Sequence, residues 1–302
     1  MVGAQSGGEV VRGASFDVRS LAILLAGAGT ALAPAFAQAS PPAFASHRAV
    51  YDISLLEADD GTDVAGVTGR LVLEFTGSEC AGYNSRLRFV TETEDVDGAR
   101  QLIDSRSETF ETADGKRLDF ANETYAGQTL AEASEGNARR NGEDIAVALK
   151  RPGEKRFAIK DSVVFPTQQM ERIITSALAG DAFVSFEVYD GSASGETVFD
   201  TAGVIGKVST AADDAATEPA VVRAGIAGMR HWPVTISYFD RRSGGEETPF
   251  YVLSFVVYEN GIGRNMRIDY GNFSLSGKLT GLEMLPEAPC AAAASPDPAG
   301  DH

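Results

Sequence analysis

Alternation of apolar and polar residues runs through most of the chain and indicates β-strands. In residues 70–75, for example, Leu71, Leu73 and Phe75 fall on one side of an extended chain. This period of two is typical of strands with one buried and one solvent-facing side. Pairs of Asp or Asn with Gly separate the segments and favour tight turns. The pattern predicts about a dozen strands joined into one large antiparallel sheet.

A sheet of this length curls, splits or closes. In residues 267–275, Ile268 and Tyr270 share one side, whereas Phe273 and Leu275 are one residue out of phase. An extra residue near positions 271–272 would restore the phase, and such a β-bulge bends a strand. We therefore predict a mainly β fold in which a large antiparallel sheet is curved.

One segment, residues 165–181, has the spacing of an amphipathic helix. Pro166 suits a first helical turn and Gly180 suits the end of a helix. The apolar residues of the helix are Met170, Ile173, Ile174, Ala177 and Leu178. The opposite side carries Gln169, Glu171, Arg172 and Ser176. We predict that this helix lies in the concave face of the sheet, where its apolar side either is plain core or faces a cavity. An apolar interior disfavours a membrane β-barrel, whose lumen is polar.

Residues 1–39 have the order of a secretory signal peptide. Positive charge comes first, an uncharged apolar run follows at residues 21–32, and Ala-x-Ala patterns end at Ala37 and Ala39. The run is shorter than the roughly 20 residues of a spanning helix, and no transmembrane segment is expected after cleavage. We predict a signal peptide at 1–39, a single β domain at 40–290 and a disordered tail at 291–302. Residues 209–220 also lack large apolar side chains, so no regular element is expected there.

The chain has two cysteines, Cys80 and Cys290. Disulfides persist in oxidising compartments, and two cysteines can pair with each other in only one way. The chain-entropy model assigns roughly 5 kcal/mol to so long a closed loop. The alternative is two free buried thiols, and the absence of a C-x-x-C motif argues against redox catalysis.

The formal net charge of −17 narrows the choice of partners. A strongly acidic protein repels phosphate backbones and anionic lipid surfaces, so nucleic acid is excluded as an expected partner.

No stretch carries a catalytic, cofactor or metal signature. Residues 190–201 resemble a calcium loop only superficially, because Ser192 and Ser194 stand at ligand positions. Ala193 occupies the place of the serine in a G-x-S-x-G motif. His231 has no partner that spacing can assign. We therefore expect a non-enzymatic protein without a metal or cofactor.

Four stretches carry a resemblance to a known family: residues 165–181, 189–207, 231–240 and 249–285. With one cysteine early and one late, they resemble the EipB-type cell-envelope integrity proteins of Gram-negative bacteria. The resemblance runs from about His47 to Cys290. It implies a soluble periplasmic β-spiral, an incompletely closed antiparallel barrel. It also implies an inner helix at Pro166 to Ala179 and a Cys80–Cys290 bridge.

The resemblance implies envelope maintenance but no molecular activity. The first hypothesis is a binding protein whose apolar concavity receives a lipid, acyl chain or hydrophobic peptide. The second is a structural scaffold whose cavity is filled by its own helix. An envelope hydrolase is a third and lacks an assembled catalytic group. A periplasmic or envelope protein is the expected class of protein partner. The candidate ligand-facing residues are Met170, Ile173, Ile174, Ala177 and Leu178.

Overall fold

The computed structural model describes residues 43–160, 162–211, 218–241 and 248–290. The predicted signal peptide at 1–39 and the predicted tail at 291–302 lie outside them.

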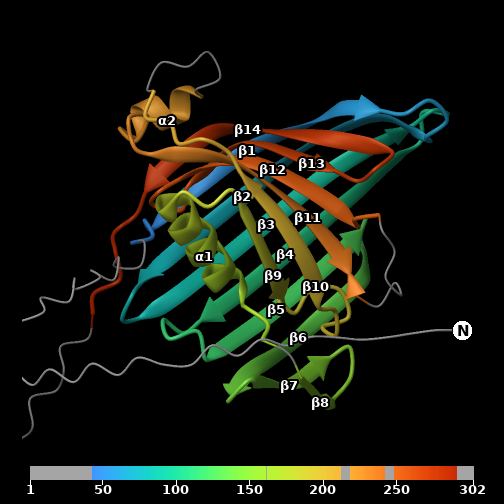
Figure 1. The fold of residues 1–302 in the computed structure, drawn as a ribbon. Helices are drawn as coiled ribbons and strands as arrows, with labels where there is room; N and C mark the ends of the chain where they lie inside the picture. Colours follow the sequence, from blue (N-terminus) through green and yellow to red (C-terminus); the bar gives the residue numbers. More distant parts are fainter. Residues whose placement is uncertain (1–42, 161, 212–217, 242–247, 291–302) are drawn as a thin grey trace, which may run out of the picture. The chain divides into compact units, whose positions relative to one another are not determined.

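Fourteen strands and two helices make up the described fold (Figure 1). The first eight strands are β1 (His47–Ala58), β2 (Val64–Ser78), β3 (Gly82–Asp95), β4 (Arg100–Glu111), β5 (Arg117–Ala126), β6 (Thr129–Asn141), β7 (Asp144–Arg151) and β8 (Lys155–Ile159). Helix α1 (Pro166–Ala179) follows them. The remaining elements are β9 (Phe183–Val188), β10 (Phe199–Ile205), α2 (Pro219–Arg223), β11 (His231–Asp240), β12 (Tyr251–Tyr258), β13 (Gly263–Asp269) and β14 (Phe273–Met284).

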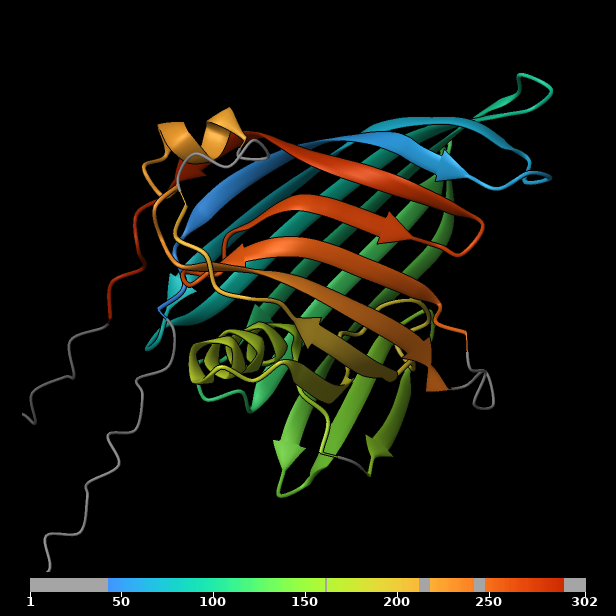
Figure 2. The ribbon, with the colours of Figure 1, turned by 45° about the horizontal axis from the view of Figure 1, so that its top comes forward.

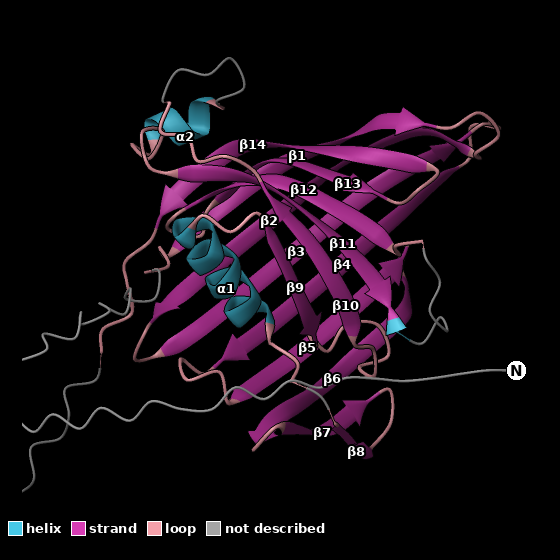
Figure 3. Ribbon diagram, viewed as in Figure 1, coloured by secondary structure: helices cyan, strands magenta, loops and turns pink. Residues whose placement is uncertain are grey.

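All fourteen strands belong to one sheet, in the order β8-β7-β6-β5-β4-β3-β2-β1-β14-β13-β12-β11-β10-β9. The first and last strands of the chain, β1 and β14, pair in the middle of the sheet, from His47↔Met284 to Ala58↔Phe273. Strands β8 and β9 are consequently the two edges, and the sheet is not closed into a barrel. Figure 3 shows that strands dominate the fold. The predicted open, curved antiparallel sheet is confirmed.

Helix α1 connects the two edges of the sheet, because it lies between β8 and β9 in the chain. Just before the helix, Val164 forms a parallel bridge with Val188 of β9, and its N–H donates to Glu187 O at 2.7 Å. This segment covers part of an edge strand, which would otherwise expose unpaired backbone groups. In Figure 2 the sheet curls around, so that α1 lies between the β9–β12 arm and the strands of the first half of the chain.

Most of the buried apolar face of α1 packs on the β10–β12 arm. Ile173 and Ile174 are 1% and 0% exposed and share a core cluster with Trp232, Val234 and Phe255. The helix ends at Gly180, which has φ +86°, as the sequence predicted for its termination. The predicted amphipathic helix within the concavity is therefore confirmed.

Two local predictions from the sequence were wrong. The phase change in residues 267–275 is not a bulge, because β13 ends at Asp269 and β14 begins at Phe273. The residues between them form a tight turn with Gly271 at φ +94°. Register shifts occur elsewhere, for example between Val50 and Tyr51. In the stretch 209–220, where no regular element was expected, residues 212–217 lie outside the described residues, but α2 begins at Pro219 and Ser209 pairs with His231.

The disulfide predicted from the sequence, Cys80–Cys290, is present, with Cα atoms 5.5 Å apart. Cys80 lies in the turn between β2 and β3, and Cys290 lies beyond the end of β14. The segment after β14 also bonds to the β1–β2 region, because the N–H of Leu285 donates to Ser46 O at 2.8 Å. The bridge thus fixes the segment after β14 to the turn between β2 and β3, close to β1.

Candidate ligand-binding cavity

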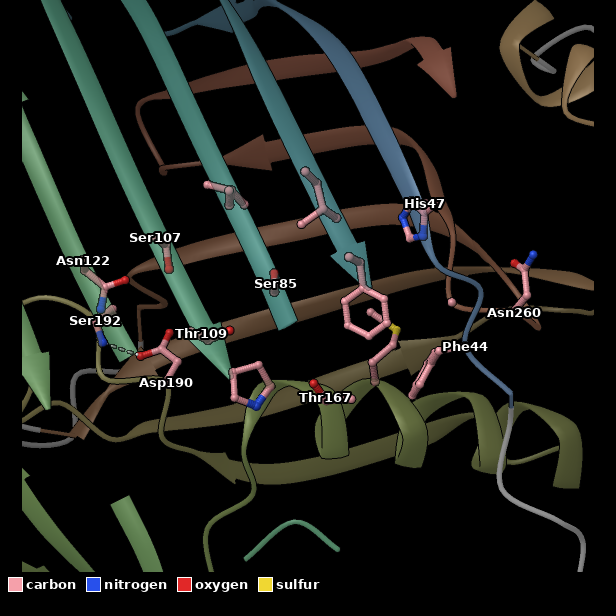
Figure 4. Close-up of a pocket in the computed structure, with 16 residues that line it drawn as sticks. Phe44, His47, Ser85, Ser107, Thr109, Asn122, Thr167, Asp190, Ser192 and Asn260 are labelled. Carbon is pink, nitrogen blue, oxygen red and sulfur yellow. Dashed lines mark hydrogen bonds between the residues drawn. The ribbon is translucent and has the colours of Figure 1, made fainter. Parts of the chain in front are cut away.

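A cavity of about 360 Å³ lies between the N-terminal half of α1 and the concave side of β1–β5 (Figure 4). This volume is within the range of small-molecule sites, about 300–1,000 Å³. Its lining residues come from five strands, from α1, from two loops and from the segment before β1. They are Phe44, His47, Leu73, Phe75, Ser85, Leu87, Ser107, Thr109, Asn122, Pro166, Thr167, Met170, Asp190, Ser192, Asn260 and Gly261.

The sheet lines the cavity with two adjacent rows of paired residues. One row runs across the strands as Leu73↔Leu87, Leu87↔Ser107 and Ser107↔Asn122. The row beside it runs as His47↔Phe75, Phe75↔Ser85 and Ser85↔Thr109. The first row becomes polar as it crosses from β3 to β4, and the second becomes polar as it crosses from β2 to β3. The cavity therefore has an apolar half at Leu73, Phe75 and Leu87 and a polar half under β4–β5.

Aromatic side chains close the end of the apolar half. Phe44, Phe75 and Tyr83 form a cluster with ring centroids 5.3–5.8 Å apart. His47 lies beside them and is nearly fully buried. Its Nδ1 donates to Ala45 O at 2.7 Å, so Nε2 is the acceptor nitrogen. Burial lowers the pKa of His47, because desolvation disfavours the charged imidazolium, and so favours the neutral imidazole.

The polar half is completed by the loop that follows β9. Asp190 projects into the cavity beside Ser107, Asn122 and Ser192 (Figure 4). Its Oδ1 accepts a hydrogen bond from the N–H of Ser192 at 2.9 Å. Burial raises the pKa of the Asp190 carboxyl, because desolvation disfavours its charged form. Within the described residues no lysine or arginine forms an ion pair with it.

The position of this loop depends on a glycine that packs against the sheet. Gly191 has φ +70°, and a Cβ there would lie 2.4 Å from the ring of Phe120. Its carbonyl accepts hydrogen bonds from Asn122 Nδ2 at 2.9 Å and from Ser134 Oγ at 2.6 Å. Any side chain at position 191 would push the loop away from β5 and β6 and shift Asp190 with it.

A buried carboxylate holds the N-terminus of α1 beside the cavity. Glu111, the last residue of β4, accepts hydrogen bonds from the N–H groups of Thr167 at 2.8 Å and Gln168 at 3.2 Å. The N-cap residue of α1 is Phe165, whose side chain cannot accept a hydrogen bond. Glu111 supplies this acceptor from another element and complements the positive end of the helix dipole. Burial raises its pKa to about 7.

The five helix residues predicted from the sequence as ligand-facing lie in three different places. Met170 lines the cavity. Ile173 and Ile174 pack in the core on the β10–β12 arm and line neither this cavity nor the hollow at the other end of the helix. Ala177 and Leu178 line that second hollow, of about 670 Å³, with Lys207 and the exposed Val208 on its rim.

Sequence reasoning missed Asp190, Glu111 and the polar row on β4 and β5. A signal for the row was present, because Ser105, Ser107 and Thr109 alternate with charged residues and leave no apolar side on that part of β4. Such a strand lines a wet cavity when its concave side is enclosed. Gln169 was predicted on the polar side of the helix but is buried, and its Oε1 accepts a hydrogen bond from Tyr238 OH at 3.4 Å.

The described part of the chain contains no group of three or more His, Cys, Asp or Glu side chains arranged to hold a metal ion. None of its helices has the length and apolar character required to cross a membrane.

An open antiparallel sheet curled around a helix, with an internal cavity beside that helix, defines a β-barrel-like class of protein. Residues 38–286 match the model of the family described as EipB-like, and the chain belongs to that family.

Two known proteins are similar to this chain. The cell envelope integrity protein EipB of Brucella abortus is 36% identical over 252 residues, which is 83% of this chain and 88% of the relative. A crystal structure of a β-barrel-like protein from Brucella abortus, from a domain of unknown function, superposes with a TM-score of 0.74. That match has 36% sequence identity and covers 80% of this chain and 99% of the solved one.

Proposed function

We propose that this protein supports the integrity of the cell envelope by binding the alkyl or acyl part of a lipid in the cavity beside α1. The envelope role is supported by the 36% identical relative, a cell envelope integrity protein. The observation that carries the binding activity is the cavity of about 360 Å³, whose walls include Leu73, Leu87 and Met170.

The size and lining of the cavity favour a small ligand over a buried peptide. A cavity of about 360 Å³ lies near the lower end of the range for small-molecule sites, about 300–1,000 Å³. A medium-length acyl chain fits this volume, whereas several peptide side chains with their backbone do not. Leu73, Leu87, Phe75 and Met170 would bury the chain, at about 25 cal/mol for each Å² of apolar surface removed from water.

Binding accounts for the site better than catalysis does. His47 uses Nδ1 to donate to Ala45 O, and no hydrogen bond joins its ring to a hydroxyl group among the described residues. A nucleophile and a base within hydrogen-bond reach are the mark of a hydrolase. The lining therefore supports a site that holds a ligand without transforming it.

The test is binding of an uncharged dye, N-phenyl-1-naphthylamine, whose emission increases in apolar surroundings. We expect saturable binding to the wild type, and displacement by lipids with medium acyl chains. Met170→Trp should fill the apolar half and weaken binding of the dye. Leu178→Trp is the matched control, because it lies on the same helix but lines the second hollow. It should leave binding unchanged.

Each variant must keep the wild-type circular dichroism spectrum for the comparison to count. If the folded wild type binds neither dye nor lipid, the helix-filled scaffold is the better description. If Leu178→Trp abolishes binding and Met170→Trp does not, the ligand lies in the second hollow and the site proposed here is wrong.

The same proposal includes a periplasmic location, based on the signal-peptide pattern of residues 1–39 and on the disulfide. Protein recovered from the periplasm of a Gram-negative host should have the intact mass of a chain that starts after Ala37 or Ala39. It should have no free thiol before reduction. A full-length product with two reactive thiols would contradict the location.

A further inference from the structure

We propose that the cavity selects amphipathic molecules whose head group carries hydroxyl donors and no negative charge. This inference rests on the proposed ligand-binding function and names the class of ligand. The acyl or alkyl chain would lie on Leu73, Leu87 and Met170, and the head group would lie in the polar half, against Asp190, Ser107 and Asn122.

The charges of the lining argue against an anionic head group. Among its sixteen residues there is no lysine and no arginine, and the titratable side chains are His47 and Asp190. His47 lies at the opposite, aromatic end (Figure 4), and burial lowers its pKa and so disfavours its charged form. A carboxylate or phosphate in the polar half would therefore face the carboxyl group of Asp190 with no cation beside it. Burying such an unpaired charge next to a like charge is costly.

The N-terminus of α1 does not supply the missing positive charge. Pro166 and Thr167 line the cavity, and helix N-termini commonly bind anions through their free N–H groups. Here the N–H groups of Thr167 and Gln168 already donate to Glu111. The protein's own carboxylate thus occupies the anion site and offsets the helix dipole.

The polar half is instead suited to hydroxyl groups. Asn122 uses its Nδ2 to donate to Ser134 and Gly191, so its Oδ1 remains an acceptor toward the cavity side of the network. Asp190 accepts the N–H of Ser192 at Oδ1 and presents its carboxyl group to the cavity. Ser107 and Thr109 add hydroxyls that donate or accept. A glycerol or sugar hydroxyl would satisfy these acceptors in either protonation state of Asp190.

Three ligands with the same chain separate charge from hydrogen bonding. They are 1-decanoylglycerol, which is uncharged and carries hydroxyls, decanoate, which is anionic, and methyl decanoate, which is uncharged and has no donor. Displacement of N-phenyl-1-naphthylamine at pH 8, below the micellar concentration, gives their dissociation constants. We expect the dissociation constant of 1-decanoylglycerol to be lower than that of each of the other two ligands by a factor of about ten or more.

Asp190→Asn tests the assigned residue. Its amide oxygen can still accept from Ser192 N, so the loop is expected to remain in place. The variant should bind decanoate about tenfold more tightly than the wild type does, and the preference for 1-decanoylglycerol over decanoate should shrink accordingly. Asp181→Asn removes the same charge at the far end of α1, beside the second hollow. It should leave all three dissociation constants unchanged.

The outcomes separate this inference from the proposed function. If neither the dye nor any ligand binds, the ligand-binding function fails. If the dye binds but decanoate competes as well as 1-decanoylglycerol, only the selectivity fails. An equal gain in decanoate affinity for Asp181→Asn and Asp190→Asn would show that net charge acts from a distance, and would overturn the role of Asp190.

Discussion

The carboxylate of Glu111, at the end of β4, accepts the N–H of Thr167 at 2.8 Å and so joins the sheet to the first turn of α1. The contact lies at the boundary of the cavity, since Thr167 is one of its lining residues. Glu111 is 3% exposed. Its pKa rises to about 7 mainly because burial disfavours the charge, and the nearby carboxylate of Glu171 adds to the rise.

This pKa gives the stability of the fold a defined dependence on pH. The folded-state pKa of about 7 exceeds the unfolded value of 4.5. The contribution of Glu111 to the free energy of unfolding is therefore fully present below pH 4.5 and falls as the pH rises toward 7. Across this range the free energy of unfolding decreases by roughly 3 kcal/mol. Glu111→Gln should remove this part of the slope when the free energy of unfolding is measured by denaturation at several pH values between 4.5 and 8.

Glu108→Gln is the control for this experiment, because Glu108 is an exposed carboxylate on the same strand. It should keep the pH slope of the wild type. Parallel pH profiles for Glu111→Gln and the wild type would show that Glu111 is not a major titrating group between pH 4.5 and 7.

The Cys80–Cys290 disulfide gives a second prediction. It closes a sequence separation of 210 residues, and removing a native disulfide typically lowers the free energy of unfolding by about 2–5 kcal/mol. Cys80→Ser, Cys290→Ser and the double substitution should cost similar amounts, since each removes the same bond. Chemical denaturation measures these free energies of unfolding, with the remaining cysteine of each single variant kept reduced. A double variant with the wild-type midpoint would mean that pairing of β1 with β14 already fixes the C-terminal segment without the bridge.

Much of the fold follows from local sequence patterns. Period-two alternation marked the strands, and Pro166 and Gly180 marked the ends of α1. What local patterns do not determine is which strands become edges. The pairing of β1 with β14 joins residues 215 to 237 positions apart, and no turn signal connects them. Gly271 illustrates the same limit, because a phase change in the alternation is equally consistent with a bulge and with a tight hairpin turn.

The candidate site was less accessible to sequence reasoning than the fold. An amphipathic stripe shows that Met170, Ile173 and Ile174 are buried, but it does not show which arm of the curled sheet each one faces. The two isoleucines pack against the β10–β12 arm, whereas Met170 lines the cavity. Asp190 could not be predicted as a site residue for a different reason, because an isolated carboxylate in an acidic chain is normally solvated. The loop is held inside by Gly191, which packs closely on Phe120 and accepts hydrogen bonds from Asn122 and Ser134.

The third prediction concerns the buried ion pair between Arg264 of β13 and Glu218, the residue before α2. The two side chains are 2% and 5% exposed, with Nη1 and Oε2 3.4 Å apart. Glu218 also accepts hydrogen bonds from the N–H groups of Asn265 at 2.9 Å and Leu279 at 3.4 Å, so it fastens α2 to β13 and β14. Arg264→Met should lower the free energy of unfolding by about 3–5 kcal/mol, because it leaves a buried carboxylate without its cation.

Two further variants decide whether the charge itself is responsible. Adding Glu218→Gln to Arg264→Met removes the uncompensated charge, keeps an acceptor for a backbone N–H, and should restore part of the lost stability. Arg267→Met on the same strand breaks exposed pairs with Glu57 and Asp269 and should cost no more than about 1 kcal/mol. Urea denaturation of the three variants provides the comparison. If the double variant is no more stable than Arg264→Met, the loss comes from the packing of the Arg264 side chain against Tyr258, whose hydroxyl accepts from Arg264 Nε at 3.0 Å, and not from the unpaired carboxylate.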